Sequence, residues 1–192
     1  MKHIILINAN IRKEDSRTLK LTNLVLDNFK DKVEIEEINL SELDLKPHTN
    51  FDNPYLKIED RFFDYSRKLA NSDGIIISTP FWDMSFPSLL KVFLEKLSIS
   101  DIMFKDDGTT CVGIAKCPFM FYLTTRGMNI EDGSKLDQAS PYLEALCELW
   151  GIKDFDFIGV SNCDYLSSEE VDRKIVKASK EGINKLKALI NK

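Results

Sequence analysis

Short, almost purely apolar runs alternate along this chain with segments of helical periodicity. The runs at 4–7, 75–78 and 119–123 are typical of strands covered on both faces. Two further strand-like runs, at 33–40 and 155–160, complete a set of five. Because such alternation requires a parallel sheet with helices on both faces, the sequence predicts an α/β fold. The expected helices cover 16–29, 58–71, 87–97, 142–150 and the region from 167 onward.

Five alternating strands favour a three-layer, doubly wound parallel sheet in the flavodoxin-like order 2-1-3-4-5. In that order, ligands bind where the carboxyl ends of strands 1 and 3 diverge. The loops expected at this point are 8–15, 79–84 and 124–128. We expect residues 1–192 to form a single domain, because this length suits one hydrophobic core. A turn at 105–108 also predicts a small hairpin outside the sheet.

Composition narrows the class of protein. A hydrophobic fraction of 43% and a charged fraction of 30% are ordinary for a globular chain. The net charge of -5 argues against nucleic-acid binding, which requires a basic surface. No apolar run approaches the roughly 20 residues that span a bilayer, and the chain begins directly with a strand. We therefore expect a cytoplasmic protein with no membrane partner and no signal peptide.

Cysteine and histidine give no sign of a metal site. The four cysteines have no CxxC spacing and no neighbouring histidine, so we interpret them as reduced thiols, mostly buried. The two histidines lie far apart in the sequence and lack partners of the metal-binding type. The residues concerned are Cys111, Cys117, Cys147, Cys163, His3 and His48.

The first loop ends at a predicted helix N-terminus, with Ser16 as its N-cap. Free backbone N–H groups and the helix dipole favour an anion there, and Arg17 and Thr18 add a charge and a hydroxyl. This set suits a phosphate monoester, whereas the loop has neither a GxGxxG pattern nor a Walker motif. The alternative is an ordinary N-cap beside a solvated Arg17. Asp15 would repel a phosphate unless its side chain points away.

The second loop, Thr79-Pro80-Phe81-Trp82-Asp83-Met84, places two large aromatic residues between a buried strand and a helix. A flat ligand packed against Phe81 and Trp82 would explain this pair. Packing against another subunit or loop is the alternative. The third loop, Thr125-Arg126-Gly127-Met128, contains a glycine that would allow close approach to a ring edge, or simply a turn. A phosphate seat with a flat wall fits FMN better than a nucleoside triphosphate.

These residues, in this order, resemble the flavodoxin-like FMN-dependent NADH azoreductases and quinone reductases. The likeness covers nearly the whole chain and rests on three motifs. The family's first motif, Ser…Ser-Gln-Ser, is similar to Asn10…Ser16-Arg17-Thr18. Its second, Pro-Met-Tyr-Asn-Phe…Leu-Lys, is similar to Pro80-Phe81-Trp82-Asp83-Met84…Leu90-Lys91. Its third, Ser-Arg-Gly-Gly, is similar to Thr125-Arg126-Gly127-Met128. The downstream pattern of the family is also matched, at Asp132-Gly133, Pro141-Tyr142-Leu143 and Gly151-Ile152.

Three positions depart from the family pattern. Asp83 stands where the family has Asn, and a carboxylate near the ring edge would disfavour an anionic reduced flavin. Met128 replaces the second glycine and would narrow the ring pocket. Asn10 replaces a hydroxyl donor. These departures bear on substrate choice and redox potential more than on the fold.

The resemblance implies an FMN enzyme that takes hydride from NADH or NADPH and reduces quinones, azo or nitroaromatic compounds by a ping-pong route. FMN carries the chemistry, so no catalytic protein residue is expected. The residues expected to bind the cofactor are Asn10, Ser16, Arg17, Thr18, Pro80, Phe81, Trp82, Asp83, Met84, Thr125, Arg126, Gly127 and Met128. A homodimer is also implied, with a shared aromatic wall. Its candidate residues, each of which could equally be core or loop packing, are Phe51, Tyr55, Phe62 and Phe104.

Three alternatives remain open at this point. An NAD(P)H-dependent FMN reductase or a flavodoxin-type electron carrier would share the fold and the cofactor. A binding protein without redox activity is the third, and the three departures are the features that would signal it. A phosphoreceiver domain is excluded, because it needs an Asp where the third strand ends, whereas this chain has Ser78-Thr79-Pro80.

We predict that replacing Ser16 or Arg17 by alanine weakens FMN binding by about 1–3 kcal/mol, the range for a hydrogen bond to a charged group. Titration of each purified variant with FMN measures the effect. Unchanged affinity in both variants would contradict the phosphate seat.

Overall fold

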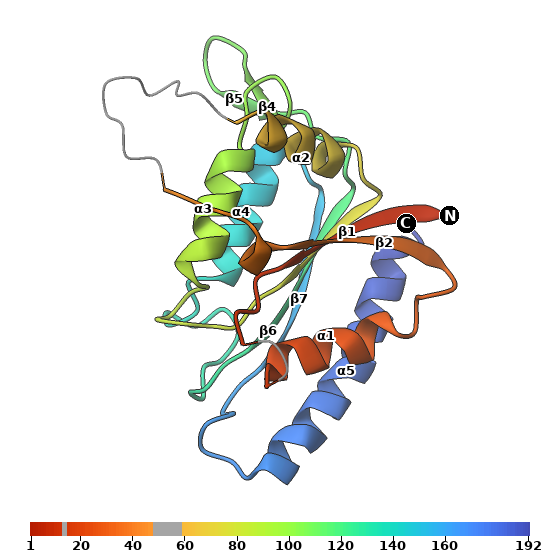
Figure 1. Cartoon of the computed structure of the whole chain (residues 1–192), viewed down its shortest axis with the longest axis vertical. Coiled ribbons are helices and arrows are strands. Elements are labelled where there is room, and N and C mark those ends of the chain that lie inside the picture. The colour runs from red at the N-terminus through yellow and green to blue at the C-terminus, as the bar shows by residue number, and fades with distance from the viewer. Residues whose placement is uncertain (13–14, 48–58) are drawn as a thin grey trace.

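The structure, a computed structural model, describes residues 1–12, 15–47 and 59–192. Its centre is a five-stranded parallel sheet with the strand order β2-β1-β3-β6-β7 (Figure 1). Counted within this sheet, the order is 2-1-3-4-5, as the sequence predicts. The strands are β1 (Lys2–Asn8), β2 (Val33–Asn39), β3 (Gly74–Ser78), β6 (Phe119–Thr125) and β7 (Asp154–Val160).

Helices cover both faces of the sheet (Figure 1). Successive residues of the central strands point to opposite faces of the sheet. Ile5 and Ile7 belong to the hydrophobic cluster on one face, whereas Ile4 and Leu6 belong to the cluster on the other. This alternation explains why the central strands are continuously apolar. The first cluster packs beneath α2 (Asp60–Ala70), α3 (Ser88–Leu97) and α4 (Ser140–Trp150), and the second beneath α1 (Arg17–Leu26) and α5 (Ser168–Ile190).

The edge strand β2 differs from the central strands. Val33 and Ile38 are buried, whereas Glu34 and Glu37 are exposed. The prediction of a partly solvated edge strand is therefore confirmed. A short 3-10 helix, η1 (Leu40–Glu42), follows it. None of the helices in the described ranges combines the length and apolar character needed to cross a membrane.

The carboxyl ends of the central strands form the base of the candidate site. Thr124 and Thr125, which the sequence assigned to a loop, are the last residues of β6, because they pair with Gly159 and Val160 of β7. The sheet therefore continues two residues further than expected. Consequently Thr125 is held by strand pairing and is buried, with 8% of its surface exposed.

The predicted hairpin is confirmed and lies outside the main sheet. Strands β4 (Phe104–Asp106) and β5 (Cys111–Gly113) pair antiparallel. Gly113 lies against Gly151, the left-handed C-cap of α4, which has φ 83°. A Cβ atom at Gly113 would lie 2.0 Å from the backbone nitrogen of Gly151, so only glycine fits at this contact.

We predict that Gly113→Ala lowers the free energy of unfolding by roughly 1–3 kcal/mol, because backbone atoms that cannot move aside block the added methyl group. Urea denaturation measures the loss. Val112→Ala in the same strand is the control: Val112 is 39% exposed, so its truncation should change stability by less than about 0.5 kcal/mol. Equal stability of Gly113→Ala and the wild type would contradict the packing.

Candidate functional site

A cleft of about 420 Å³ opens at the carboxyl edge of the sheet, at the predicted switch point. A hollow of about 330 Å³ adjoins it and shares Phe81, Trp82, Gly127 and Asp164 with it. Both volumes are in the range of small-molecule sites. The cleft is lined by Ile11, Arg12, Asp15, Ser16, Arg17, Thr18, Pro80, Phe81, Trp82, Thr125, Arg126, Gly127, Cys163 and Asp164. The hollow adds Asp83, Met84, Met128 and Ile130.

The N-terminus of α1 forms one end of the cleft. Ser16 is its N-cap, as predicted, and its hydroxyl oxygen accepts a hydrogen bond from the N–H of Leu19 at 3.1 Å. The first turn of α1 contains no acidic residue. The initial N–H groups of a helix have no partner within the helix, so this end of the cleft presents donors to an anion.

Asn10 lies beneath this helix end, not in the cleft wall, which differs from its predicted role in cofactor binding. Only 4% of its surface is exposed. Its amide nitrogen donates to the Ser78 hydroxyl at 2.7 Å and to Asn8 Oδ1 at 2.8 Å, while its amide oxygen accepts from the Ser16 hydroxyl at 3.0 Å. Asn10 therefore orients Ser16. The amide points inward because it joins the ends of β1 and β3.

Two threonines close the floor of the cleft. The hydroxyls of Thr18 and Thr125 are 2.6 Å apart and hydrogen-bonded, which ties α1 to the end of β6. Both residues are buried. Deeper in the same layer, Thr22 and Ser78 share a hydrogen bond of 2.7 Å. The floor is therefore a connected set of hydroxyl and amide groups with fixed positions.

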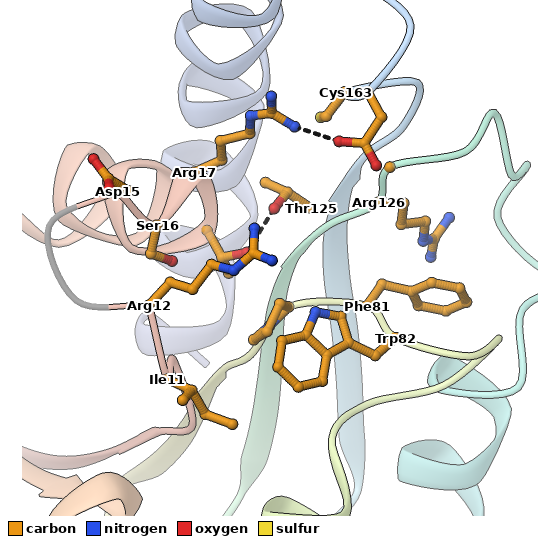
Figure 2. Close-up of a pocket in the computed structure, with 14 residues that line it drawn as sticks. Ile11, Arg12, Asp15, Ser16, Arg17, Phe81, Trp82, Thr125, Arg126 and Cys163 are labelled. Atoms are coloured by element: carbon orange, nitrogen blue, oxygen red, sulfur yellow. Dashed lines mark hydrogen bonds and ion pairs between the residues drawn. The ribbon is translucent and has the colours of Figure 1, made fainter.

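Arg17 lines the cleft but is already engaged. Its guanidinium donates to Asp164 at 2.7 Å, across the cleft from α1 to the loop after β7 (Figure 2). Asp15 points away from the aromatic wall in Figure 2, so its carboxylate does not face the centre of the cleft. Arg12, which sequence reasoning missed, extends into the cleft from the first loop and supplies a second cation.

The aromatic loop ends in a tight turn. Trp82 and Ser85 exchange two backbone hydrogen bonds of 2.8 Å each. Asp83 and Met84 occupy the central positions with φ 47° and 67°, which is the pattern of a type I′ turn. The turn holds both residues at the rim of the hollow, and the Asp83 side chain is exposed.

The two aromatic residues of this loop differ in exposure. Trp82 is 40% exposed and its indole faces the cleft beside Ile11 (Figure 2). Phe81 is only 8% exposed and its ring packs against the Arg126 guanidinium at 5.1 Å. Both residues line the cleft, but Trp82 supplies most of the exposed flat surface there. A shared wall for a flat ligand stays a prediction.

Arg126 lines the cleft, but its side chain is buried and engaged within the fold. Its side chain has no exposed surface and donates to Asp137 at 2.9 Å, to Asp132 at 2.5 Å and to the carbonyl oxygen of Ile130 at 3.2 Å. Burial alone would raise the pKa of Asp137, but hydrogen bonds from Ser140 and the charge of Arg126 outweigh it and lower that pKa. The ion pair fixes the loop that carries Gly127 and Met128.

A fourth loop, which follows β7, completes the cleft and was missed in the sequence. It runs beside the third loop, with backbone hydrogen bonds from Asn162 to Met128, from Cys163 to Arg126 and from Asp164 to Gly127, at 2.9–3.0 Å. This loop could have been predicted from the strand order, because the carboxyl end of β7 must lie at the same edge of the sheet as those of the other parallel strands.

Gly127 lines both the cleft and the hollow, so its close approach to a ring edge stays a prediction. A Cβ atom there would lie 2.1 Å from Asp164 Oδ2, so the missing side chain leaves room for this carboxylate. Met128 is 44% exposed and lines the hollow, and its narrowing of a ring pocket stays a prediction.

Two of the four aromatic residues considered for a shared wall lie in the described part of the chain. Phe62 is fully buried and packs edge-on against Tyr65 and Phe93, so it belongs to the core. Phe104 is half-buried in β4 and packs on the same cluster. Phe51 and Tyr55 lie outside the described residues. Among the described residues, no group of three histidine, cysteine or acidic side chains could hold a metal ion.

The sheet order and the cleft at its switch point define a doubly wound α/β protein with a small-molecule site. A family model described as flavodoxin-like fold matches residues 2–186, so the chain belongs to the family with this fold. It is 29% identical, over the full length of both chains, to an FMN-dependent NADH:quinone oxidoreductase of Clostridium perfringens. A second enzyme of that species, FMN-dependent NADH:quinone oxidoreductase 2, is 28% identical over 93% of this chain and 96% of its own.

Solved structures show the same fold. An FMN-dependent NADH-azoreductase from Bacillus anthracis, solved with FMN, superposes with a TM-score of 0.82 at 20% identity and covers 97% of this chain and 99% of its own. An NAD(P)H:quinone oxidoreductase from Methanothermobacter marburgensis gives a TM-score of 0.77 at 11% identity, with coverage of 95% and 98%. At these identities the likeness concerns the fold alone.

We predict that Asp137→Asn lowers the free energy of unfolding by roughly 3–5 kcal/mol at pH 7, because it leaves the buried Arg126 charge without its buried partner. Asp132→Asn is the control. It removes a carboxylate that is 53% exposed from the same guanidinium, and should cost about 1 kcal/mol or less. Equal losses in urea denaturation would contradict the assignment.

The same pair predicts a pH dependence. The pKa of Asp137 is lowered in the folded state, so its stabilisation is fully present above the unfolded value of about 4 and is lost as the pH falls below it. The stability difference between the wild type and Asp137→Asn should therefore narrow below about pH 4. A difference that stays constant from pH 7 to pH 3 would show that the charge of Asp137 is not what stabilises the fold.

Proposed function

We propose that this chain is an FMN-dependent NAD(P)H oxidoreductase that reduces quinones, azo compounds or nitroaromatic compounds. One observation carries the proposal: the N-terminus of α1 and an exposed indole line the same cleft on a flavodoxin-like sheet. The naming of full-length relatives as FMN-dependent NADH:quinone oxidoreductases supports FMN as cofactor and NADH as co-substrate.

The lining includes groups suited to the phosphate and to the ring of FMN. The Ser16 hydroxyl and the first N–H groups of α1 would hold the phosphate, with Arg12 and Arg17 as nearby cations. Trp82 would pack against the flat ring, and Met84 and Met128 would border it in the adjoining hollow. When bound, FMN supplies the two-electron hydride chemistry of the reaction.

The protein contributes binding, orientation and exclusion of water. Asn10 holds Ser16 in place, and the buried Arg126 packs against Phe81. The hollow beside Trp82 is one space, so we infer that the nicotinamide and the acceptor occupy it in turn, as a ping-pong route requires.

The remaining inferences concern the assembly. We infer that residues 1–192 act as a single domain and that a second copy completes the pocket in a homodimer, because Trp82 and Met128 expose large apolar surfaces at its mouth. Four free cysteines, of which three are buried, fit a reducing compartment and support a cytoplasmic location.

An NAD(P)H-dependent FMN reductase is the second candidate. Asp164 places a carboxylate at the cleft and pairs with Arg17, an arrangement that favours an exchangeable flavin over a retained one. Such an enzyme would show saturation by free FMN during turnover, whereas a quinone reductase with resident FMN would not.

We predict that the purified protein, supplied with FMN, shows a bound-flavin spectrum that bleaches with anaerobic NADH and returns when a quinone is added. Parallel traces with NADPH, an azo dye and a nitroaromatic compound define the specificity. A bound flavin that neither nicotinamide bleaches would indicate an electron carrier instead. The absence of flavin binding would contradict the proposal.

A further inference from the structure

Asp164 holds a position in the cleft that the FMN chemistry does not call for. It lines both the cleft and the adjoining hollow, so it lies where the two spaces meet. Its backbone N–H donates to the Gly127 carbonyl oxygen at 3.0 Å, which fixes the loop that carries it. Its side chain fills the space left open by the missing side chain of Gly127.

The carboxylate of Asp164 engages a cation of the expected phosphate seat. Arg17 is the first residue of α1, and its guanidinium donates to Asp164 Oδ1 at 2.7 Å (Figure 2). A phosphate at this helix end would meet an arginine that is already paired and a carboxylate of like charge nearby. Charges within about 10 Å act on each other at ordinary ionic strength.

We propose that Asp164 is a specificity-determining residue that sets how strongly the cleft prefers a phosphorylated flavin over riboflavin. The inference rests on the proposed FMN site and adds a competition to it: the Asp164 carboxylate and the flavin phosphate compete for Arg17. Riboflavin has no phosphate, so this competition does not affect its binding.

The ion pair is suited to such an exchange. Arg17 and Asp164 are 45% and 66% exposed, so separating them costs little and both side chains have room to turn. The guanidinium can pair with a phosphate through two parallel hydrogen bonds, which a single bond to a carboxylate oxygen does not match. FMN therefore displaces Asp164 from Arg17 and loses part of its binding free energy to that displacement.

The test compares the affinities of FMN and riboflavin in the full chain, measured by quenching of flavin fluorescence. Asp164→Asn should tighten FMN binding by about three- to tenfold, the size expected for one exposed charge, and leave riboflavin within twofold of the wild type. In an Arg17→Gln background, Asp164→Asn should increase the FMN affinity by a smaller factor, because Arg17, for which the carboxylate and the phosphate compete, is absent.

Asp172→Asn is the matched control. Asp172 pairs with Lys20 of α1 at 2.7 Å with similar exposure, but it lies outside the cleft lining. The Asp172→Asn variant loses the same charge as Asp164→Asn, and it should bind FMN and riboflavin with the affinities of the wild type.

The inference is overturned if Asp164→Asn binds FMN no more tightly than the wild type, or if it tightens FMN and riboflavin equally. It is also overturned if Asp172→Asn gives the same gain, since net charge would then explain the effect. FMN binding by the wild type in any of these cases leaves the proposed function intact. If neither the wild type nor any variant bound either flavin, both this inference and the proposed function would be overturned.

Discussion

Buried polar groups at the carboxyl edge of the sheet must be hydrogen-bonded, and this requirement shapes the cleft. The ends of β1, β3 and β6 are buried, yet they carry Asn8, Ser78 and Thr125. Each finds a partner on a neighbouring element, chiefly Asn10, Thr22 and Thr18. The resulting network locks α1 against three strands, so its N-terminus keeps one position relative to the sheet.

At the other end of the cleft, the buried side chain of Arg126 likewise holds neighbouring segments in place. Arg126 has no exposed surface, so its charge must be neutralised within the fold, and Asp137 and Asp132 do so. The guanidinium then presents its face to Phe81. The ion pairs of Arg126 thereby hold both the third loop and Phe81 in place. The helix end and the third loop are therefore both held in place by hydrogen bonds and ion pairs within the fold.

Much of the fold could be predicted from the sequence, because its signals are local. The apolar runs identified the five sheet strands, Ser16 marked the start of α1, and the turn at 105–108 indicated the hairpin. Three of the four loops at the cleft were also expected. The fourth follows β7, and the rule that parallel strands end at one edge would have found it.

Side-chain directions could not be predicted, because they depend on contacts between distant residues. Asn10 turns inward because Ser78 is beside it, 68 residues later in the chain. Phe81 and Trp82 are neighbours with opposite environments, since only Phe81 meets Arg126. The partner of Arg17 lies 147 residues away, and no local pattern indicates that pairing.

A crystal structure of the chain with FMN would test the proposed site most directly. We expect the phosphate to accept hydrogen bonds from the Ser16 hydroxyl and the first N–H groups of α1, with the ring beside Trp82 in the adjoining hollow. FMN bound with its phosphate away from α1, or with its ring out of contact with Trp82, would contradict the assignment of this cleft as the flavin site.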